Sequence, residues 1–142
     1  MSMEGVTMED SILLTIKKLL GLESDYDVYD SDLIVLINTS FLSLLQLGIG
    51  PKEGFMITGA TEIWSDYIGQ NVPLRAVQSY IYLKTKTMFD PPESSFVLNA
   101  MSEQMKELEF RLNIYAEEAA REPDSTTVNA LIPQETEEEG GD

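Results

Sequence analysis

The sequence predicts an all-α protein, a small helical bundle of about four to five helices with a flexible acidic C-terminal tail. Apolar residues recur three and four positions apart in several separate segments, which is the spacing of one face of an α-helix. Clusters of proline and glycine separate these segments and mark turns. Beyond residue 121 the regular spacing is lost, and the remaining residues are acidic with no Lys or Arg. We therefore expect one helical domain over residues 1–121 and an extended tail over residues 122–142, within a chain of 142 residues.

The first helix is expected within "TMEDSILLTIKKLLGL", residues 7–22. Thr7 and Asp10 resemble a capping box with Asp in place of Glu, which predicts a start at Thr7. Gly21 is expected to end the helix in a left-handed conformation. The polar loop "ESDYDVYDSD" follows and offers Asp30 or Ser31 as the N-cap of the next helix.

The second helix is expected in "DLIVLINTSFLSLLQLGIG", residues 32–50, with Gly48 and Gly50 at its end. Leu36 and Leu47 widen the apolar arc beyond the stripe that faces a core. A helix that is apolar on more than one side lies centrally or contacts a neighbour.

A connector rich in glycine follows over residues 48–70. It lacks the Gly-Lys-Ser/Thr ending of a phosphate-binding loop, so its glycines indicate turns. "FMIT" is compatible with a short extended piece, and "TEIWSDYIG" with a short helix or turn. Trp64 and Tyr67 are more often core anchors than stacking platforms for a ligand, and we expect them to hold this connector against the body.

Two further helices are expected in "VPLRAVQSYIYLKTKTMF", residues 72–89, and "SSFVLNAMSEQMKELEFRLNIYAEEAARE", residues 94–122. The second carries an apolar seam at alternating four- and three-residue spacing. Its members are Met101, Met105, Leu108, Leu112 and Tyr115. Phe110 and Ile114 lie off this seam.

The corner between these two helices is "FDPPESSF", residues 89–96. Pro91 and Pro92 disfavour helical geometry in the residues before them, and Phe89 and Phe96 bracket the turn. We expect this corner to limit the angle between the two helices, with Ser94 or Ser95 capping the second.

Composition excludes several classes of site. The formal net charge is −16, and the tail contributes seven of the 25 acidic residues, so the body as well as the tail repels nucleic acid phosphates. The absence of Cys and His removes disulfides, Cys- or His-based zinc sites and the usual general base. No segment has the roughly 18 uninterrupted apolar residues of a membrane span. The acidic "MSMEGVTMED" does not predict export.

The only acidic cluster of the body is Asp25, Asp27, Asp30 and Asp32. It fits a calcium loop poorly, because Tyr29 stands where a third ligand belongs and the central glycine is replaced by Asp30. A polar interhelical loop is the preferred interpretation. We expect no catalytic residues, no metal site and no cofactor.

The tail contains one apolar element, "TTVNALIP", residues 126–133. Val128, Leu131 and Ile132 gain nothing from burial in an otherwise polar tail unless they have a partner. They are candidates for an arm that docks on another subunit. The alternatives are a chance apolar patch or a segment that folds back on its own domain.

Residues 8–117 resemble the head–tail connector (adaptor) proteins of long-tailed bacteriophages. Four stretches carry the resemblance: "ILLTIKKLLGL", "DLIVLINTSFLSLLQLGIGPKEGF", "WSDYIG" and "YIYLKTKTMFDPPESSFVLNAMSEQMKELEFRLN". The resemblance implies a helical connector domain in a dodecameric ring beneath the portal, within the virion neck, made in the host cytoplasm. It also implies a platform for the stopper or tail proteins and a lumen through which DNA passes without sequence-specific binding. No catalytic motif belongs to it.

A ring needs two different contact faces on each subunit. The candidates are Leu36 and Leu47 on one side and Phe110 and Ile114 on the other, while the tail is expected to reach the portal or an adjacent copy. Two other functions stay open: a soluble helical adaptor that binds a partner helix through its Met-rich face, and a carboxylate- or metal-dependent enzyme built on residues 25–32.

Overall fold

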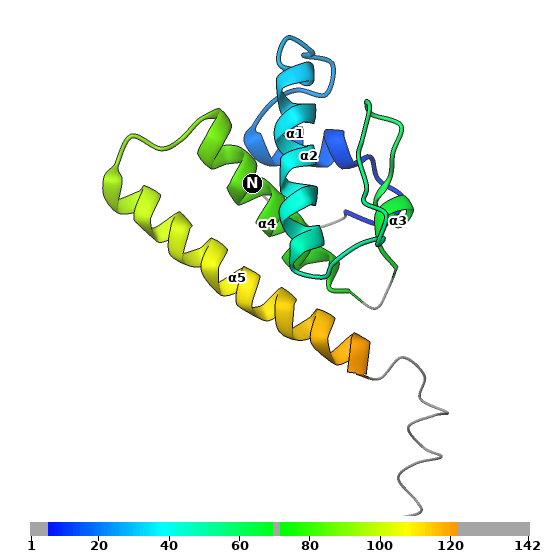
Figure 1. The fold of residues 1–142 in the computed structure, drawn as a ribbon. Helices are drawn as coiled ribbons and strands as arrows, with labels where there is room; N and C mark the ends of the chain where they lie inside the picture. The colour runs from blue at the N-terminus through cyan, green and yellow to red at the C-terminus, as the bar shows by residue number, and fades with distance from the viewer. Residues whose placement is uncertain (1–5, 70–71, 122–142) are drawn as a thin grey trace, which may run out of the picture.

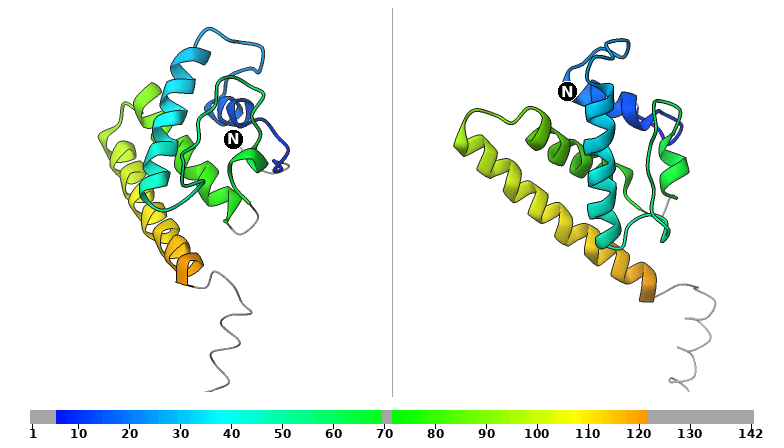
Figure 2. Two further views of the ribbon diagram at one scale, coloured as in Figure 1. Left: turned by 45° about the vertical axis from the view of Figure 1, so that its right-hand side comes forward. Right: turned by 45° about the horizontal axis from the view of Figure 1, so that its top comes forward.

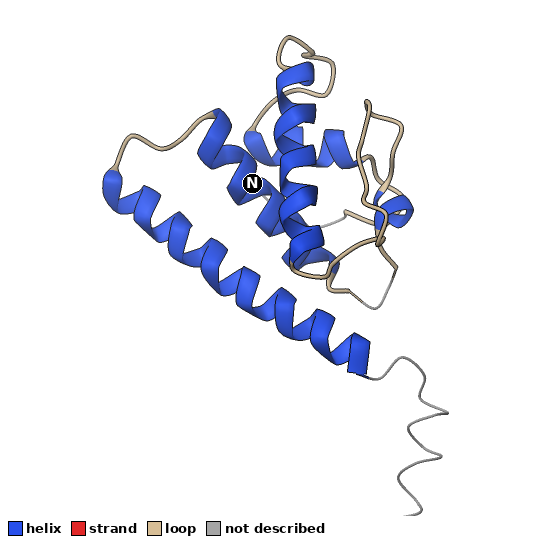
Figure 3. Ribbon diagram, viewed as in Figure 1, coloured by secondary structure: helices blue, strands red, loops and turns tan. Residues whose placement is uncertain are grey.

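The computed structural model describes residues 6–69 and 72–121. This part of the chain forms five α-helices and no β-strand (Figures 1 and 3), which confirms the all-α prediction. In chain order the helices are α1 (Ile12–Leu20), α2 (Asp30–Gln46), α3 (Trp64–Tyr67), α4 (Leu74–Phe89) and α5 (Ser95–Arg121). The predicted tail, residues 122–142, lies outside the described residues.

Helix α1 begins at Ile12 with Ser11 as its N-cap, so the predicted start at Thr7 was wrong. The Ser11 hydroxyl accepts from the Leu14 amide at 3.2 Å, whereas Thr7 and Asp10 close a separate turn with a 2.7 Å bond from the Thr7 amide to Asp10 Oδ2. This turn stays outside the helix because the backbone of Asp10 accepts from the Trp64 amide. At the other end Gly21 adopts φ 85°, as expected of a left-handed helix stop.

Helix α2 begins at Asp30, and its N-cap position is Tyr29, which makes no side-chain cap. The expected cap by Asp30 or Ser31 was therefore wrong. The Asp30 carboxylate instead lies 2.9 Å from Lys17 Nζ, and this ammonium also donates to the Ser24 carbonyl at 3.1 Å. The Lys17 side chain is only 1% exposed, so a buried ion pair fastens α1, the following loop and the start of α2 together.

Two glycines after α2 are required because other parts of the chain pack closely against their backbone, and not only because the chain turns there. Gly48 has φ 92°, and a Cβ there would lie 2.9 Å from Ala116 Cβ on α5. Gly50 has φ 96°, and a Cβ there would lie 2.7 Å from the Tyr67 ring. Both conformations favour glycine, and both positions let a distant element pack directly on the backbone.

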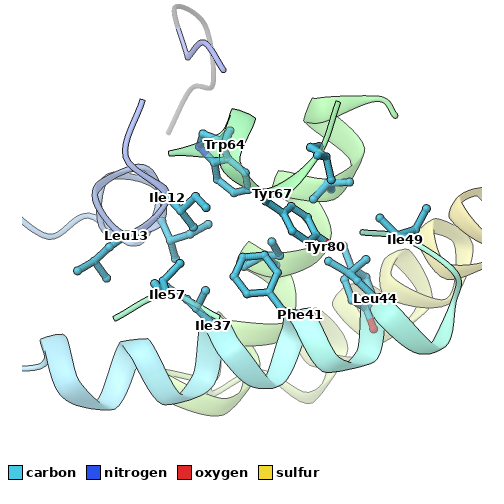
Figure 4. Close-up of a cluster of buried hydrophobic side chains, with 14 of the residues drawn as sticks. Ile12, Leu13, Ile37, Phe41, Leu44, Ile49, Ile57, Trp64, Tyr67 and Tyr80 are labelled. Atoms are coloured by element: carbon cyan, nitrogen blue, oxygen red, sulfur yellow. The ribbon is translucent and has the colours of Figure 1, made fainter. Parts of the chain in front are cut away.

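The connector between α2 and α4 is fastened at two places. Asn38 on α2 accepts from the Ile57 amide at 2.8 Å and donates to the Ile57 carbonyl at 3.0 Å. Further along, Ile63 makes an antiparallel bridge with Ser11. The buried Trp64 donates from Nε1 to Thr15 Oγ1 at 3.1 Å. The connector therefore covers one side of α1 and α2 and contributes to the core (Figure 4).

Within this connector, Glu62 accepts hydrogen bonds from Thr58 and Gly59. Partial burial acts to raise the pKa of Glu62, but these hydrogen bonds outweigh it and leave the pKa below its ordinary value of 4.5. A carboxyl whose pKa is lower in the folded than in the unfolded state stabilises the fold above the unfolded pKa, and the stabilisation is lost as the pH falls through the folded pKa.

We therefore expect Glu62→Gln to lower the free energy of unfolding at neutral pH by about 1 kcal/mol or less. The gap from wild type should close in acid, because the wild-type carboxyl is then protonated as well. Urea denaturation followed by circular dichroism across a pH series checks this. A gap that stays constant into strong acid would show that the carboxylate charge is irrelevant.

Helices α4 and α5 lie against each other, and α4 also packs on α1 and α2 (Figures 1 and 2). Tyr80 on α4 donates to Glu109 on α5 at 2.8 Å. Burial raises the pKa of Tyr80, and the hydrogen bond to Glu109 and the charge of that carboxylate raise it further. Asn113 on α5 donates to the Leu47 carbonyl at 3.3 Å, which ties α5 to the end of α2. Leu112 is the one fully buried residue of α5.

The corner joins α4 and α5 through residues 90–94. Phe89 is half-buried and stacks edge-on against Tyr29 at 5.2 Å between ring centroids, so the end of α4 is anchored to the start of α2. Ser94 accepts from the Val97 amide at 3.3 Å and supplies the expected cap. Phe96 is 81% exposed, so only one of the two bracketing rings packs within the subunit.

Candidate interaction surfaces

Most of the exposed apolar side chains of the described residues lie in four places: on α2 with the connector, on the outer side of α5, at the loop before α2, and at the corner between α4 and α5, where Met88, Phe96 and Val97 are exposed. Large contiguous apolar exposure on a soluble protein marks a contact site more often than chance.

The first surface is a groove between α2 and residues 53–56, with a volume of about 660 Å³. Val35, Leu42 and Met56 line it and are 63%, 58% and 66% exposed. Phe55 lines it as well and packs inward on Phe41, whose ring also contacts Tyr67 (Figure 4 shows Phe41 and Tyr67 in the core). We call this surface the α2 groove. Its floor is thus part of the core, while its walls stay open to solvent.

The α2 groove is almost free of charge. Residues 33–51 contain no Asp, Glu, Lys or Arg, and Glu53 is the one charged residue that lines the groove. Over the whole chain, by contrast, 24% of the residues are charged. Depletion of charged residues distinguishes the core of a protein–protein interface from the rest of a protein surface, so the α2 groove has the composition of a contact surface.

The second surface is the outer side of α5. Phe110 is 67% exposed and Ile114 is 38% exposed. Charged residues surround Phe110, and Arg111 and Glu107 form an exposed pair at 2.7 Å on the same helix. Exposed pairs of this kind contribute little to stability. The face combines apolar and charged groups, as the rim of an interface does.

The third surface lies at the loop between α1 and α2. Val28 is 63% exposed, and Tyr26 and Tyr29 stack edge-on at 6.0 Å between ring centroids. The predicted acidic cluster belongs to this loop, but Asp30 is held by Lys17. Among residues 6–69 and 72–121 no group of three or more acidic side chains is placed to hold a metal ion. The distinguishing features of this loop are therefore its pair of stacked tyrosine rings and its acidic side chains.

The predicted contact residues differ in how far they are exposed to solvent. Phe110 and Ile114 are exposed and on one helix, as their position off the seam predicts. Leu36 and Leu47 are only half-buried, and Leu47 packs against the core. Val128, Leu131 and Ile132 lie outside the described residues. Sequence reasoning missed Val35 and Leu42, although their seven-residue spacing places both on the same face of α2.

The Met-rich face of α5 is largely turned inward. Met105 and Leu108 are half-buried and pack against the core. A second cavity of about 590 Å³ lies between α4 and α5 and is lined by Tyr82, Leu108 and Arg111 among others. The guanidinium of Arg111 is paired with the carboxylate of Glu107. No helix of the described part of the chain is long and apolar enough to cross a membrane.

The family model described as "Phage connector protein" matches residues 12–119, about three quarters of the chain, from the start of α1 into the last turn of α5. Neither a curated protein nor a solved structure matches the chain.

Proposed function

Because this chain belongs to the phage connector protein family, we propose that it assembles into a ring that joins the portal to the stopper or tail proteins. Membership of the family makes the chain a structural head–tail connector of a bacteriophage virion. The ring, its dodecameric symmetry and its particular neighbours belong to the proposal. The family match over residues 12–119 is the observation that carries it.

The exposed surfaces support a ring built from unlike contacts. Closed rings form when one patch of a subunit binds a different patch of the next. Leu36 on α2 and Leu47 just beyond its end are proposed to contribute to one side, and Phe110 and Ile114 on α5 to the other. Phe110 is the most exposed of these four residues, with 67% of its surface open to solvent.

Charge supports a lumen that does not hold DNA. The chain has 25 acidic and nine basic residues, and an acidic wall repels phosphates. Among the basic residues, Lys17, Lys86 and Arg111 are engaged by carboxylates of the same subunit. DNA is proposed to pass through the ring without sequence-specific contacts.

The corner between α4 and α5 is proposed to keep ring geometry uniform. Pro91 and Pro92 restrict the backbone, and Phe89 is anchored on Tyr29, whereas Phe96 is left free for a neighbour. An error in this angle would recur in every subunit of a closed ring.

Removal of this protein from the phage tests the proposed function. We expect particles whose heads are filled with DNA but carry no tails, because the joint between portal and tail is missing. Electron microscopy of the lysate and of purified neck complexes checks both this outcome and the ring symmetry. Intact infectious particles without the protein would rule the proposal out.

The tail is proposed to take part in docking on the portal. We expect Leu131→Asp with Ile132→Asp to weaken co-purification with the portal, because two apolar contacts worth about 1.5–3 kcal/mol each are replaced by charge. The matched control is Gly140→Asp with Gly141→Asp, which adds the same charge outside the apolar element. Equal recovery of portal with both double variants would remove the tail from the docking contact.

A further inference from the structure

The α2 groove leaves apolar side chains exposed to solvent, which raises the question of what binds there. A second copy offering its α5 face is a poor fit, because Phe110 is surrounded by Lys106, Glu107 and Arg111. Inserting that face into an uncharged groove would strip water from those charges without pairing them. The occupant should be apolar, narrow and itself uncharged.

One segment of the chain outside the described residues has that composition. Residues 125–134, "STTVNALIPQ", contain no charged side chain, although acids occupy positions on both sides of them. They include Val128, Leu131 and Ile132, the apolar residues that have no evident reason to lie in an acidic tail. We propose that residues 125–134 bind in the α2 groove of their own chain in the free subunit.

The position where the described chain ends makes this possible. Ala116 on α5 lies against Gly48 at the end of α2, and a Cβ on Gly54 would lie 4.0 Å from Leu45, which lines the groove. Helix α5 continues five residues past Ala116, about 7.5 Å. The seven residues from Arg121 to Val128 span up to about 23 Å when extended. Val128 therefore reaches the near end of the groove, and ten extended residues exceed the roughly 15 Å from Leu45 to Val35 along α2.

Attachment to the same chain favours binding even where the contacts are modest. A short flexible link gives a tethered segment an effective concentration in the millimolar range. The acids that flank residues 125–134 stay outside the groove, in solvent, so they need no partner there. The bound segment covers Val35, Leu42 and Met56 and keeps them from aggregating contacts until the subunit meets its partner. This binding does not depend on the proposed ring.

Disulfide trapping in the full chain tests the inference, because the natural sequence has no cysteine. Thr39 lies between Val35 and Leu42 on the wall of the groove. The pair Thr39→Cys with Val128→Cys is expected to form a disulfide within one chain, with a yield that does not change on dilution. The matched control, Arg111→Cys with Val128→Cys, places the first thiol at an exposed site of α5. This site lies ten residues before Arg121, about 15 Å along the helix and within the reach of the tail, and the pair is expected to cross-link poorly.

A second comparison separates groove binding from mere proximity. Adding Leu131→Asp and Ile132→Asp to the Thr39→Cys, Val128→Cys chain is expected to abolish the cross-link. Adding Gly140→Asp and Gly141→Asp, which introduces the same charge, is expected to preserve it. In the chain without introduced cysteines, the Met56 methyl resonance is expected to shift when Leu131→Asp and Ile132→Asp release the tail.

Three results would overturn the inference: equal cross-linking from Thr39 and Arg111, a cross-link that survives Leu131→Asp with Ile132→Asp, or a disulfide that forms only between chains. The last would assign the groove to a second copy. All of these measurements use the isolated protein. Their failure therefore leaves the head–tail role untouched, and tailless particles would not by themselves support groove binding.

Discussion

Replacing Asp30 by alanine is expected to lower the free energy of unfolding by about 3 kcal/mol, the lower end of the range for breaking a buried ion pair. The Lys17 side chain is 1% exposed, and Asp30 lies 2.9 Å from its ammonium. Without the carboxylate, that ammonium keeps only the Ser24 carbonyl as a described partner. Asp30 is itself 30% exposed, so water replaces part of the lost interaction, and the upper end of the range is not expected.

A double-mutant cycle separates the loss of the ion pair itself from the cost of leaving the Lys17 ammonium buried without a carboxylate. Lys17→Met removes the buried charge while keeping an unbranched apolar chain, and Lys17→Met with Asp30→Ala should be more stable than Asp30→Ala alone. Urea denaturation followed by circular dichroism supplies all three values. An Asp30→Ala change below about 0.5 kcal/mol, the size of an ordinary surface substitution, would show that Lys17 finds solvent by moving.

Replacing Trp64 by alanine is expected to cost about 3–5 kcal/mol, the usual effect of deleting a fully buried large aromatic side chain. Trp64 is 0% exposed, and it joins the connector to α1 through Thr15. Since domains are stable by only about 5–15 kcal/mol, this change removes a large share of the total. Thermal and urea denaturation by circular dichroism measure it, because the substitution removes the one tryptophan of the chain.

Two controls apportion the Trp64 effect. Trp64→Phe keeps an aromatic ring in the core and should cost clearly less than Trp64→Ala. Thr15→Val keeps the shape of the neighbouring side chain but removes the acceptor of the indole N–H, and it should cost about 1–3 kcal/mol for the unsatisfied donor. If Trp64→Ala and Trp64→Phe proved equally mild, the indole would not be a core anchor.

The sequence was sufficient for the helices but not for their starts. Periodicity identified the apolar faces of α2, α4 and α5, and Gly21 and Ser94 were recognised from local rules. The start of α1 depends on the backbone of Asp10, which accepts from Trp64, 54 positions away in the sequence. The carboxylate of Asp30 is likewise claimed by Lys17 on another helix. Local capping rules contain neither contact.

The contact surfaces were less predictable for a related reason. Spacing shows which residues of α2 are apolar, but it does not show which of them the connector covers. Asn38 holds Ile57 against one side of α2 and leaves Val35 and Leu42 open at the edge. Gly48 was read as a helix stop, whereas its contact with Ala116 requires the path of α5.

The hydrogen bond between Trp64 and Thr15 also bears on how fast the protein folds. The two residues are 49 positions apart, and closing a loop of that length costs about 3.4 kcal/mol of chain entropy before the contact forms. Most helical bundles fold quickly because their contacts are local. Here the core is complete only when a distant connector returns to the first helix, so folding includes a long-range closure that helical content alone does not reveal.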